Sequence, residues 1–295
     1  MSDPTVADLL KRVRKIELVT RGLVRETIGG EYHSSFKGQG IDFDDFREYQ
    51  PGDEVRSIDW NVTARLNHPY IKKFAEEREL TVFLAVDISA SGGYGSVNQS
   101  KRELAAEVAA LLAFSAISNQ DKVGLILFAD DVELYLPPRK GSRHILRIIR
   151  EILFVDPKSW GTDLRPALRM LVKASPRRAL VFVLSDFIGE NYESALRTAA
   201  IKHDLVAIQI KDPAEATLPA AGWVTFEDPE TGEQSLVNTS RIAFRRAYHK
   251  LATAWQAERD ALFKAHSIDK IELLTGQDYL PSLHAFFKSR SKHPR

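Results

Sequence analysis

The fold of this chain is decided by the stretch Leu80-Thr-Val-Phe-Leu-Ala-Val-Asp-Ile-Ser-Ala-Ser-Gly-Gly93. Its first part is a nearly continuous apolar run of strand length that ends in Asp87. Strands of a parallel sheet are covered on both faces and have this uniformly apolar pattern. Small oxygen-bearing side chains and two glycines follow at once. We therefore predict a fully buried strand that runs into a polar loop.

Beyond this stretch, strand and helix patterns alternate. Apolar runs of strand length recur at 122–129, 178–185, 205–210 and 270–274, with a short hairpin partner at 132–136. Helical spacing of apolar residues is found at 101–118, 142–153, 164–174 and 193–203. Such alternation implies right-handed crossovers. The predicted fold class is α/β, with a doubly wound, mostly parallel sheet covered on both faces.

One insertion interrupts this alternation at about residues 222–266. It reads as a hairpin over 223–237, with a turn at 229–232, followed by a long helix over 241–265. Ser240 precedes this helix, and serine is a favoured N-cap residue. We predict that Ser240 caps the helix.

The N-terminal part of the chain differs in its residue pattern and composition. Residues 6–25 have helical spacing, whereas residues 29–73 are rich in Gly, Asp and aromatic residues, with a turn signal at 49–53. We predict a helix and a small β subdomain over residues 1–79, and an α/β domain over residues 80–295 that contains the inserted hairpin and long helix. Within the subdomain, Trp60 is predicted to be an apolar anchor, and Asp42, Asp44 and Asp45 to form a solvated turn rather than a calcium site.

Composition narrows the function classes. Lys plus Arg (41) nearly balances Asp plus Glu (40), so no bulk positive charge favours nucleic-acid binding. The 295 residues contain no cysteine, which excludes disulfides, thiolate metal sites and cysteine nucleophiles. The N-terminus lacks a signal-peptide pattern, and no apolar run is long enough to span a bilayer. We expect a cytoplasmic protein.

Five oxygen-bearing residues follow predicted strands or open a predicted helix. In an open parallel sheet, ligands bind beyond the carboxyl ends of the strands. Hydroxyl and carboxylate oxygens favour Mg²⁺, with Mn²⁺ or Ca²⁺ as the other candidates. Asp-x-Ser-x-Ser on its own is more typical of a structural turn than of a metal site. The fuller set predicts a metal site made of Asp87, Ser89, Ser91, Thr162 and Asp186.

The order of these residues resembles the von Willebrand factor A domain and its metal-ion-dependent adhesion site. More specifically, the chain resembles the domain of unknown function 58 family, which is often encoded beside MoxR-type AAA+ ATPases. Further matching stretches lie at 38–49, at 51–60 with its continuation to 79, and at 274–290. The resemblance covers nearly the whole chain.

This resemblance implies a metal-binding adaptor that works with a MoxR-like AAA+ ATPase in assembling or remodelling a client complex. Ser89, Ser91 and Thr162 would be direct ligands, whereas Asp87 and Asp186 would act directly or through water. An acidic residue of the client would complete the coordination of the ion. A non-enzymatic protein-interaction module is therefore the first hypothesis.

Two alternatives remain. A Mg²⁺-dependent phosphohydrolase of the haloacid dehalogenase type also places an aspartate at the end of its first buried strand, where Asp87 would be the nucleophile. Its general acid would stand two residues later, and that position is Ser89. The other alternative is a scaffold whose metal site stays vacant and whose N-terminal subdomain makes the contacts.

Overall fold

The computed structural model describes residues 6–24, 32, 35–36, 41–66, 68–76, 79–227 and 232–292. Its centre is a six-stranded sheet with the order β10-β7-β6-β3-β4-β5. All neighbouring pairs are parallel except β4 and β5 at one edge. This topology confirms the predicted α/β class. The strands are β3 Thr81–Asp87, β4 Lys122–Phe128, β5 Val132–Arg139, β6 Leu180–Ser185, β7 Asp204–Lys211 and β10 Asp269–Leu274.

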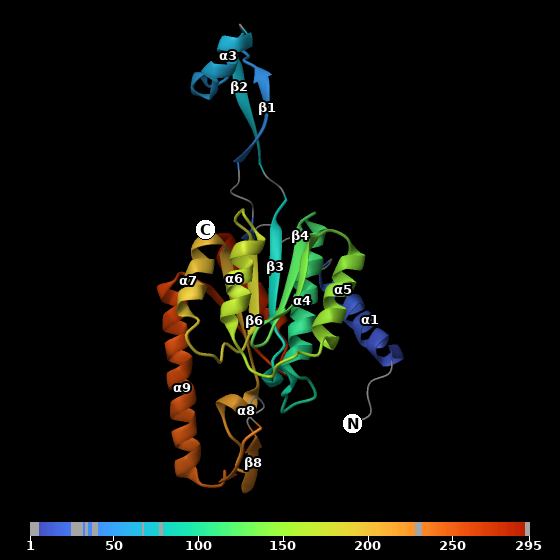
Figure 1. Cartoon of the computed structure of the whole chain (residues 1–295), viewed down its shortest axis with the longest axis vertical. Coiled ribbons are helices and arrows are strands. Elements are labelled where there is room, and N and C mark those ends of the chain that lie inside the picture. The colour runs from blue at the N-terminus through green and yellow to red at the C-terminus, as the bar shows by residue number, and fades with distance from the viewer. Residues whose placement is uncertain are drawn as a thin grey trace.

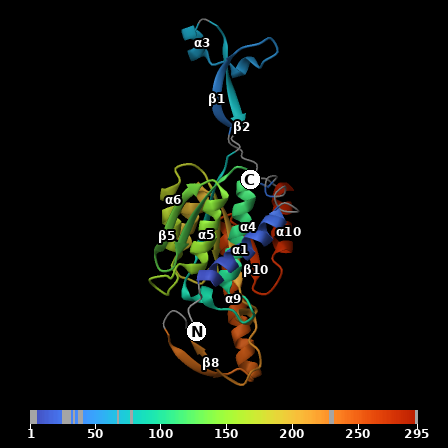
Figure 2. The ribbon, with the colours of Figure 1, turned by 90° about the vertical axis from the view of Figure 1, so that its right-hand side faces the viewer.

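Helices cover both faces of this sheet. One apolar core lies between the sheet and α1 (Val6–Leu23), α4 (Lys101–Ser118), α5 (Ser142–Phe154) and α10 (Leu280–Lys292) (Figures 1 and 2). A second core lies under α6 (Leu164–Ala174), α7 (Glu193–Lys202) and the last part of α9 (Ile242–Ala265). The central strand β3 is buried along its length because both cores use its side chains. This burial on both faces explains why the sequence of β3 is a nearly continuous apolar run.

Helix α4 is enclosed on nearly every side. It packs on the sheet, and α1 and α5 lie against its outer surface (Figure 2). Its sequence is accordingly rich in Ala and Leu without a clear polar face, as expected of a helix buried in a core. Ser100 caps its N-terminus in a capping box with Glu103. The first residue of α4 is thereby fixed at the edge of the sheet where β3 ends.

Two segments project beyond the sheet at opposite ends of its strands (Figure 1). Beyond the edge where β3 begins lie the antiparallel strands β1 (Ile41–Glu48) and β2 (Tyr70–Glu76), with the short helices η2 (Val55–Ser57) and α3 (Trp60–Leu66) between them. Beyond the edge where β3 ends lies an arm. It consists of α8 (Pro213–Ala216), the hairpin β8 (Trp223–Glu227) and β9 (Gln234–Asn238), and the first half of α9.

Three sequence predictions are wrong. Arg241 is the N-cap of α9 and makes no side-chain cap bond. The Ser240 hydroxyl instead accepts a hydrogen bond from the backbone N–H of Gly222, which closes the base of the hairpin. Trp60 is 65% exposed and anchors nothing within the described part of the chain.

The third error concerns the acidic cluster of the N-terminal segment. The backbone of Asp42, Asp44 and Asp45 belongs to β1 rather than to a turn, with an irregular register between Phe43 and Asp45. The side chains of the three acids lie outside the described residues. Nothing more follows about a calcium site there.

The segment 49–53 forms the predicted turn. The N–H of Asp53 donates to the carbonyl of Gln50, and Gly52 has a φ of 111°. That backbone conformation favours glycine, because a side chain there would be strained. None of the described helices is long and apolar enough to cross a membrane.

Candidate metal centre

Two neighbouring strand ends bring the predicted carboxylates together. Strands β3 and β6 are hydrogen-bonded neighbours, with Val86 opposite Leu184. The residues that follow are therefore neighbours at the carboxyl ends of the two strands. Asp87 ends β3, and Asp186 follows β6 directly. Both side chains are buried, with 8% and 5% of their surface exposed. Two acids so close together and so little exposed need nearby groups that compensate their charge.

The Asp87 carboxylate is held from two sides. The hydroxyl of Ser185 donates to Oδ2 of Asp87 at 2.6 Å. The backbone N–H of Ser89 donates to Oδ1 at 2.9 Å, which folds the loop back over the carboxylate. Burial and the neighbouring charge of Asp186 raise the pKa of Asp87 to about 6, against the hydrogen bonds from Ser185 and Ser89. A positive charge at this place would relieve both effects.

The two predicted serines connect one strand end to the other. Oγ of Ser89 lies 3.1 Å from Oγ of Ser91. The Ser91 hydroxyl in turn donates to Oδ2 of Asp186 at 2.9 Å. Together with the bonds to Asp87, this chain joins four of the five predicted residues in one cluster. Ile88, which stands between Asp87 and Ser89, packs in the apolar core instead.

The loop that carries Thr162 lies beside this cluster. The carbonyl of Trp160 accepts a hydrogen bond from the N–H of Ala90, and the N–H of Asp163 donates to the carbonyl of Ala129. On its other side, a methyl group at Gly189 would lie 3.4 Å from the carbonyl oxygen of Thr162. The backbone of Thr162 is thus held between the loops that follow β3 and β6. Asp87 at the end of β3 and the other four predicted residues, on the loops, therefore lie in segments that contact one another.

The backbone after Asp186 is strained and strongly anchored. Phe187 has a φ of 57°, which is rare for a residue with a bulky side chain. Its ring is buried and packs edge-on against Phe263 of α9, with ring centroids 5.1 Å apart. The N–H of Ile188 then donates to Oδ1 of Asp186 at 3.0 Å. Packing by α9 therefore sets the direction of the Asp186 carboxylate.

A lysine that the sequence analysis did not single out reaches the same carboxylate. Nζ of Lys101, the first residue of α4, lies 2.8 Å from Oδ2 of Asp186 and 2.6 Å from Oε1 of Glu215. Burial alone would lower the pKa of Lys101, but the charges of the two carboxylates outweigh it and raise the pKa. The signal that was available is the basic charge of Lys101 and Arg102 in the first turn of a helix, next to the positive end of the helix dipole.

Helix α8 extends the network toward the arm. Oε2 of Glu215 accepts from the N–H of Asp212 at 2.9 Å, as part of a capping box. The Asp212 carboxylate is fully buried and accepts hydrogen bonds from Ser96 and Thr275. These bonds outweigh burial and lower the pKa of Asp212. The loop before α4 and the base of the arm are therefore tied to one charged residue.

Helix α9 reaches the cluster by a second route. Nε2 of Gln256 donates to Oε1 of Gln209 at 3.0 Å, and Nε2 of Gln209 donates to the carbonyl of Asp186 at 3.3 Å. Gln209 lies on β7 and is fully buried. The hydroxyl of Tyr248, also on α9, donates to the carbonyl of Glu215 at 3.0 Å. Helix α9 thus reaches both carboxylates that pair with Lys101: Asp186 through Gln209, and Glu215 directly.

The donor set suits a hard divalent cation. Hydroxyl and carboxylate oxygens are the ligands that such ions take. Among the described residues, no group of three or more Asp, Glu or His side chains is arranged to hold a metal. An ion at the cluster would therefore depend on serine and threonine hydroxyls beside its two carboxylates.

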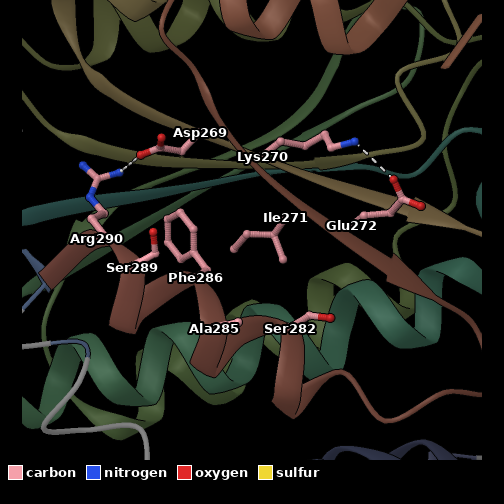
Figure 3. A pocket seen from close by; sticks show the side chains of 9 residues that line it. All are labelled: Asp269, Lys270, Ile271, Glu272, Ser282, Ala285, Phe286, Ser289 and Arg290. Atoms are coloured by element: carbon pink, nitrogen blue, oxygen red, sulfur yellow. Dashed lines mark hydrogen bonds and ion pairs between the residues drawn. The ribbon is translucent and has the colours of Figure 1, made fainter. Parts of the chain in front are cut away.

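A pocket of about 630 Å³ lies elsewhere, between β10 and α10 (Figure 3). Strands β7 and β6 separate it from β3. Its charged lining residues are paired, Asp269 with Arg290 and Lys270 with Glu272, around the apolar side chains of Ile271 and Phe286. No residue of the oxygen cluster lines this pocket, so it does not belong to the candidate centre.

The order of the sheet, and the helices that cover both of its faces, define the α/β class of this protein. Residues 45–258 match the family model described as "Protein of unknown function DUF58". The chain belongs to this family.

Relatives of similar sequence include two uncharacterized bacterial proteins. The chain is 31% identical to the uncharacterized protein Rv1480 of Mycobacterium tuberculosis, over 99% of this chain and 92% of that protein. It is 26% identical to the uncharacterized protein YeaD of Bacillus subtilis, over 61% of this chain and 42% of that protein.

Among solved structures, the chain is similar to the conserved hypothetical protein BatB from Bacteroides thetaiotaomicron, with 20% identity and a TM-score of 0.47 over 72% of this chain and 98% of that one. It is also similar to the SpRpn10 VWA domain, with 11% identity and a TM-score of 0.39 over 69% of this chain and 93% of that one.

Proposed function

We propose that this protein is a divalent-cation-dependent protein-interaction module that serves as an adaptor for a MoxR-type AAA+ ATPase. The observation that carries the proposal is a cluster of four residues at the carboxyl ends of the strands. Hydrogen bonds join Asp87, Ser89, Ser91 and Asp186 there. Because an AAA+ ATPase consumes ATP, we place this activity in the cytoplasm.

In this proposal the hydroxyls of Ser89, Ser91 and Thr162 hold Mg²⁺ directly, and Asp87 and Asp186 hold it directly or through water. Mn²⁺ and Ca²⁺ are the other candidate ions, since they take the same oxygen ligands. When bound, the ion supplies a positive charge that accepts an acidic side chain of the client. The chain's own contribution is to keep the oxygen donors in place through the hydrogen bonds described above.

The surroundings of the cluster support a binding role. Each of the three loops that carry site residues exposes at least one large side chain: Tyr94 is 46% exposed, Trp160 60% and Ile188 49%. Exposed apolar and aromatic side chains around a polar centre are typical of protein-interaction surfaces. A hydrolase of the haloacid dehalogenase type would need a carboxylic acid at position 89, where this chain has a hydroxyl.

Affinity capture tests the proposal. The immobilised full chain is incubated with a purified MoxR-type ATPase in Mg²⁺ or in EDTA, and the retained ATPase is measured. We expect capture in Mg²⁺ that is lost in EDTA and in Asp87→Ala. The exposed Glu258 provides a matched control, since Glu258→Ala removes a carboxylate elsewhere and should leave capture unchanged.

Two results would count against the proposal. Equal capture in Mg²⁺, in EDTA and by Asp87→Ala would contradict the dependence on the ion. No retention of the ATPase by the wild-type chain in Mg²⁺ would contradict the adaptor role.

A further inference from the structure

Lys101 occupies a position that helix stability does not explain. It is the first residue of α4 and is 4% exposed. Lysine is almost never fully buried unless it is paired. A basic residue in the first turn also faces the positive end of the helix dipole. The position must therefore be explained by what the ammonium group contacts.

The ammonium group shares an oxygen with the candidate metal centre. Oδ2 of Asp186 accepts both from Nζ of Lys101, at 2.8 Å, and from the hydroxyl of Ser91, at 2.9 Å. An ion held by Ser91 and Asp186 would compete with the ammonium group for this carboxylate. The second carboxylate on the ammonium group, that of Glu215, lies 2.6 Å away.

We propose that Lys101 is a tethered cation that holds Asp186 while no divalent ion is bound and yields it to the ion by moving toward Glu215. Lys101 thereby sets the affinity of the site for its ion. This inference rests on the proposed metal centre and adds its regulation. Charge balance supports it, because a Lys101–Glu215 pair leaves Asp87 and Asp186 to balance the two charges of the ion.

Glu215 is built to receive the ammonium group. Its Oε2 is fixed by the N–H of Asp212, so that Oε1 stays directed at Lys101. Its backbone carbonyl accepts from the hydroxyl of Tyr248, which holds α8 against α9. Its side chain is 28% exposed, against 3% for Asp186. A carboxylate with more solvent around it pairs with an ammonium group at a smaller desolvation cost.

The experiment measures Mn²⁺ affinity of the full chain by the electron paramagnetic resonance signal of the free ion. Lys101→Met keeps the length of the side chain and removes its charge. A positive charge within about 4 to 6 Å of a carboxylate lowers the affinity of that carboxylate for another cation, the proton, by roughly 10- to 1000-fold. We therefore expect Lys101→Met to bind Mn²⁺ about tenfold or more tightly than the wild type, and Lys101→Arg to bind it about as weakly as the wild type does.

Two further variants complete the experiment. Glu215→Gln takes away the carboxylate that would keep Lys101 paired after Asp186 has gone to the ion. This variant should therefore bind Mn²⁺ more weakly than the wild type. Lys122→Met is the matched control: this lysine is half exposed and pairs with Glu79 at the opposite edge of the sheet. Removing its charge should leave the affinity within about twofold.

The outcomes separate this inference from the metal site itself. Damage to packing would weaken binding, so a gain in affinity in Lys101→Met is not a structural side effect. Equal or weaker binding by a folded Lys101→Met would overturn the tethered-cation role and leave the metal site standing. If Lys101→Met does not fold, unchanged or tighter binding by Glu215→Gln would overturn that role. Failure of both the wild type and Lys101→Met to bind Mn²⁺ would overturn the role and the metal site together.

Discussion

The hydroxyl of Ser91 donates to Oδ2 of Asp186 at 2.9 Å, although 95 positions separate the two residues in the sequence. This bond closes the cluster between the loops after β3 and β6. It forms with protein groups alone, so the oxygen donors are already gathered. Such preorganisation lowers the cost of binding an ion, since little has to be ordered at that moment.

Trp160 tests whether the exposed side chains around the cluster contact a partner. It is 60% exposed, and only its backbone carbonyl is bonded to the site loop at Ala90. We expect Trp160→Ala to weaken capture of the ATPase by about tenfold, a typical effect of removing a central aromatic side chain from an interface. Its Mn²⁺ affinity should match the wild type. Trp223→Ala, on the arm, is a control of equal exposure. Capture that is unchanged in Trp160→Ala would place the partner elsewhere.

Asp121 predicts a pH dependence of stability. Its carboxylate accepts from the N–H of Leu80 at 2.8 Å and from the hydroxyl of Tyr32 at 3.4 Å. Burial raises the pKa of Asp121 from 3.8 to about 6. The folded state therefore holds this proton more tightly than the unfolded state. The charged form costs stability above about pH 6, and the cost disappears as the pH falls toward 3.8.

Asp121→Asn should consequently raise the free energy of unfolding at pH 7.5 by about 1 to 3 kcal/mol. The gain should shrink between pH 6 and pH 4, where the wild-type carboxylate takes up its proton. Urea unfolding of both proteins across this range is the measurement. A variant that is less stable than the wild type at pH 7.5 would show that the charge of Asp121 stabilises the fold.

Arg290 ties the last helix to the sheet (Figure 3). Its guanidinium group is 5% exposed, bonds Asp269 at 2.6 Å and Asp204 as well, and lies 4.6 Å from the ring centroid of Phe36. Arg290→Met would remove the buried cation that two carboxylates share, so we expect a loss of about 3 kcal/mol in the free energy of unfolding.

Arg290→Lys should lose less, because an ammonium group keeps the charge but not the fork that bonds two acids. The exposed Lys288, on the same helix, serves as the control: Lys288→Met should change the free energy of unfolding by less than about 0.5 kcal/mol. Equal stability of Arg290→Met and the wild type in urea would refute the structural role of the ion pairs.

Gly95 lies in the loop that joins the cluster to α4. A methyl group there would lie 2.4 Å from the carbonyl oxygen of Gln99, a backbone atom that cannot turn aside. Gly95→Ala should therefore lower the free energy of unfolding by about 1 to 3 kcal/mol and weaken Mn²⁺ binding. At Gly93, on the same loop, nothing lies within 4 Å of such a methyl group. Gly93→Ala is the control, and thermal unfolding that ranks the two variants equally would contradict this loop geometry.

The sequence predicted the sheet well for a physical reason. Strands such as β3 and β6 are covered on both faces, so their apolar runs are unbroken and their ends are marked by the first polar residues. The same ends locate Asp87 and Asp186. That these side chains meet follows from β3 and β6 being neighbours, which strand patterns alone do not reveal.

What the sequence did not predict depends on tertiary contacts. Lys101 has no motif, and it matters only because α4 begins beside β6 and α8. Ser240 is a good N-cap by type, but its hydroxyl serves Gly222 in the hairpin. Trp60 reads as a core residue by type, yet the segment that carries it projects from the sheet. Residue type alone does not indicate the surroundings of any of these three side chains.

The central claim is that five side chains, from the end of β3 and from three loops, hold one divalent ion. Anomalous diffraction from crystals soaked in Mn²⁺ tests it most directly. The account predicts one strong peak per chain among the oxygens of Asp87, Ser89, Ser91, Thr162 and Asp186, at about 2.0 to 2.3 Å from the hydroxyl ligands. The peak should be lost in Asp186→Asn. At saturating Mn²⁺, a map with no peak at this cluster, or with Nζ of Lys101 still on Asp186 and the ion bound elsewhere, would contradict the account.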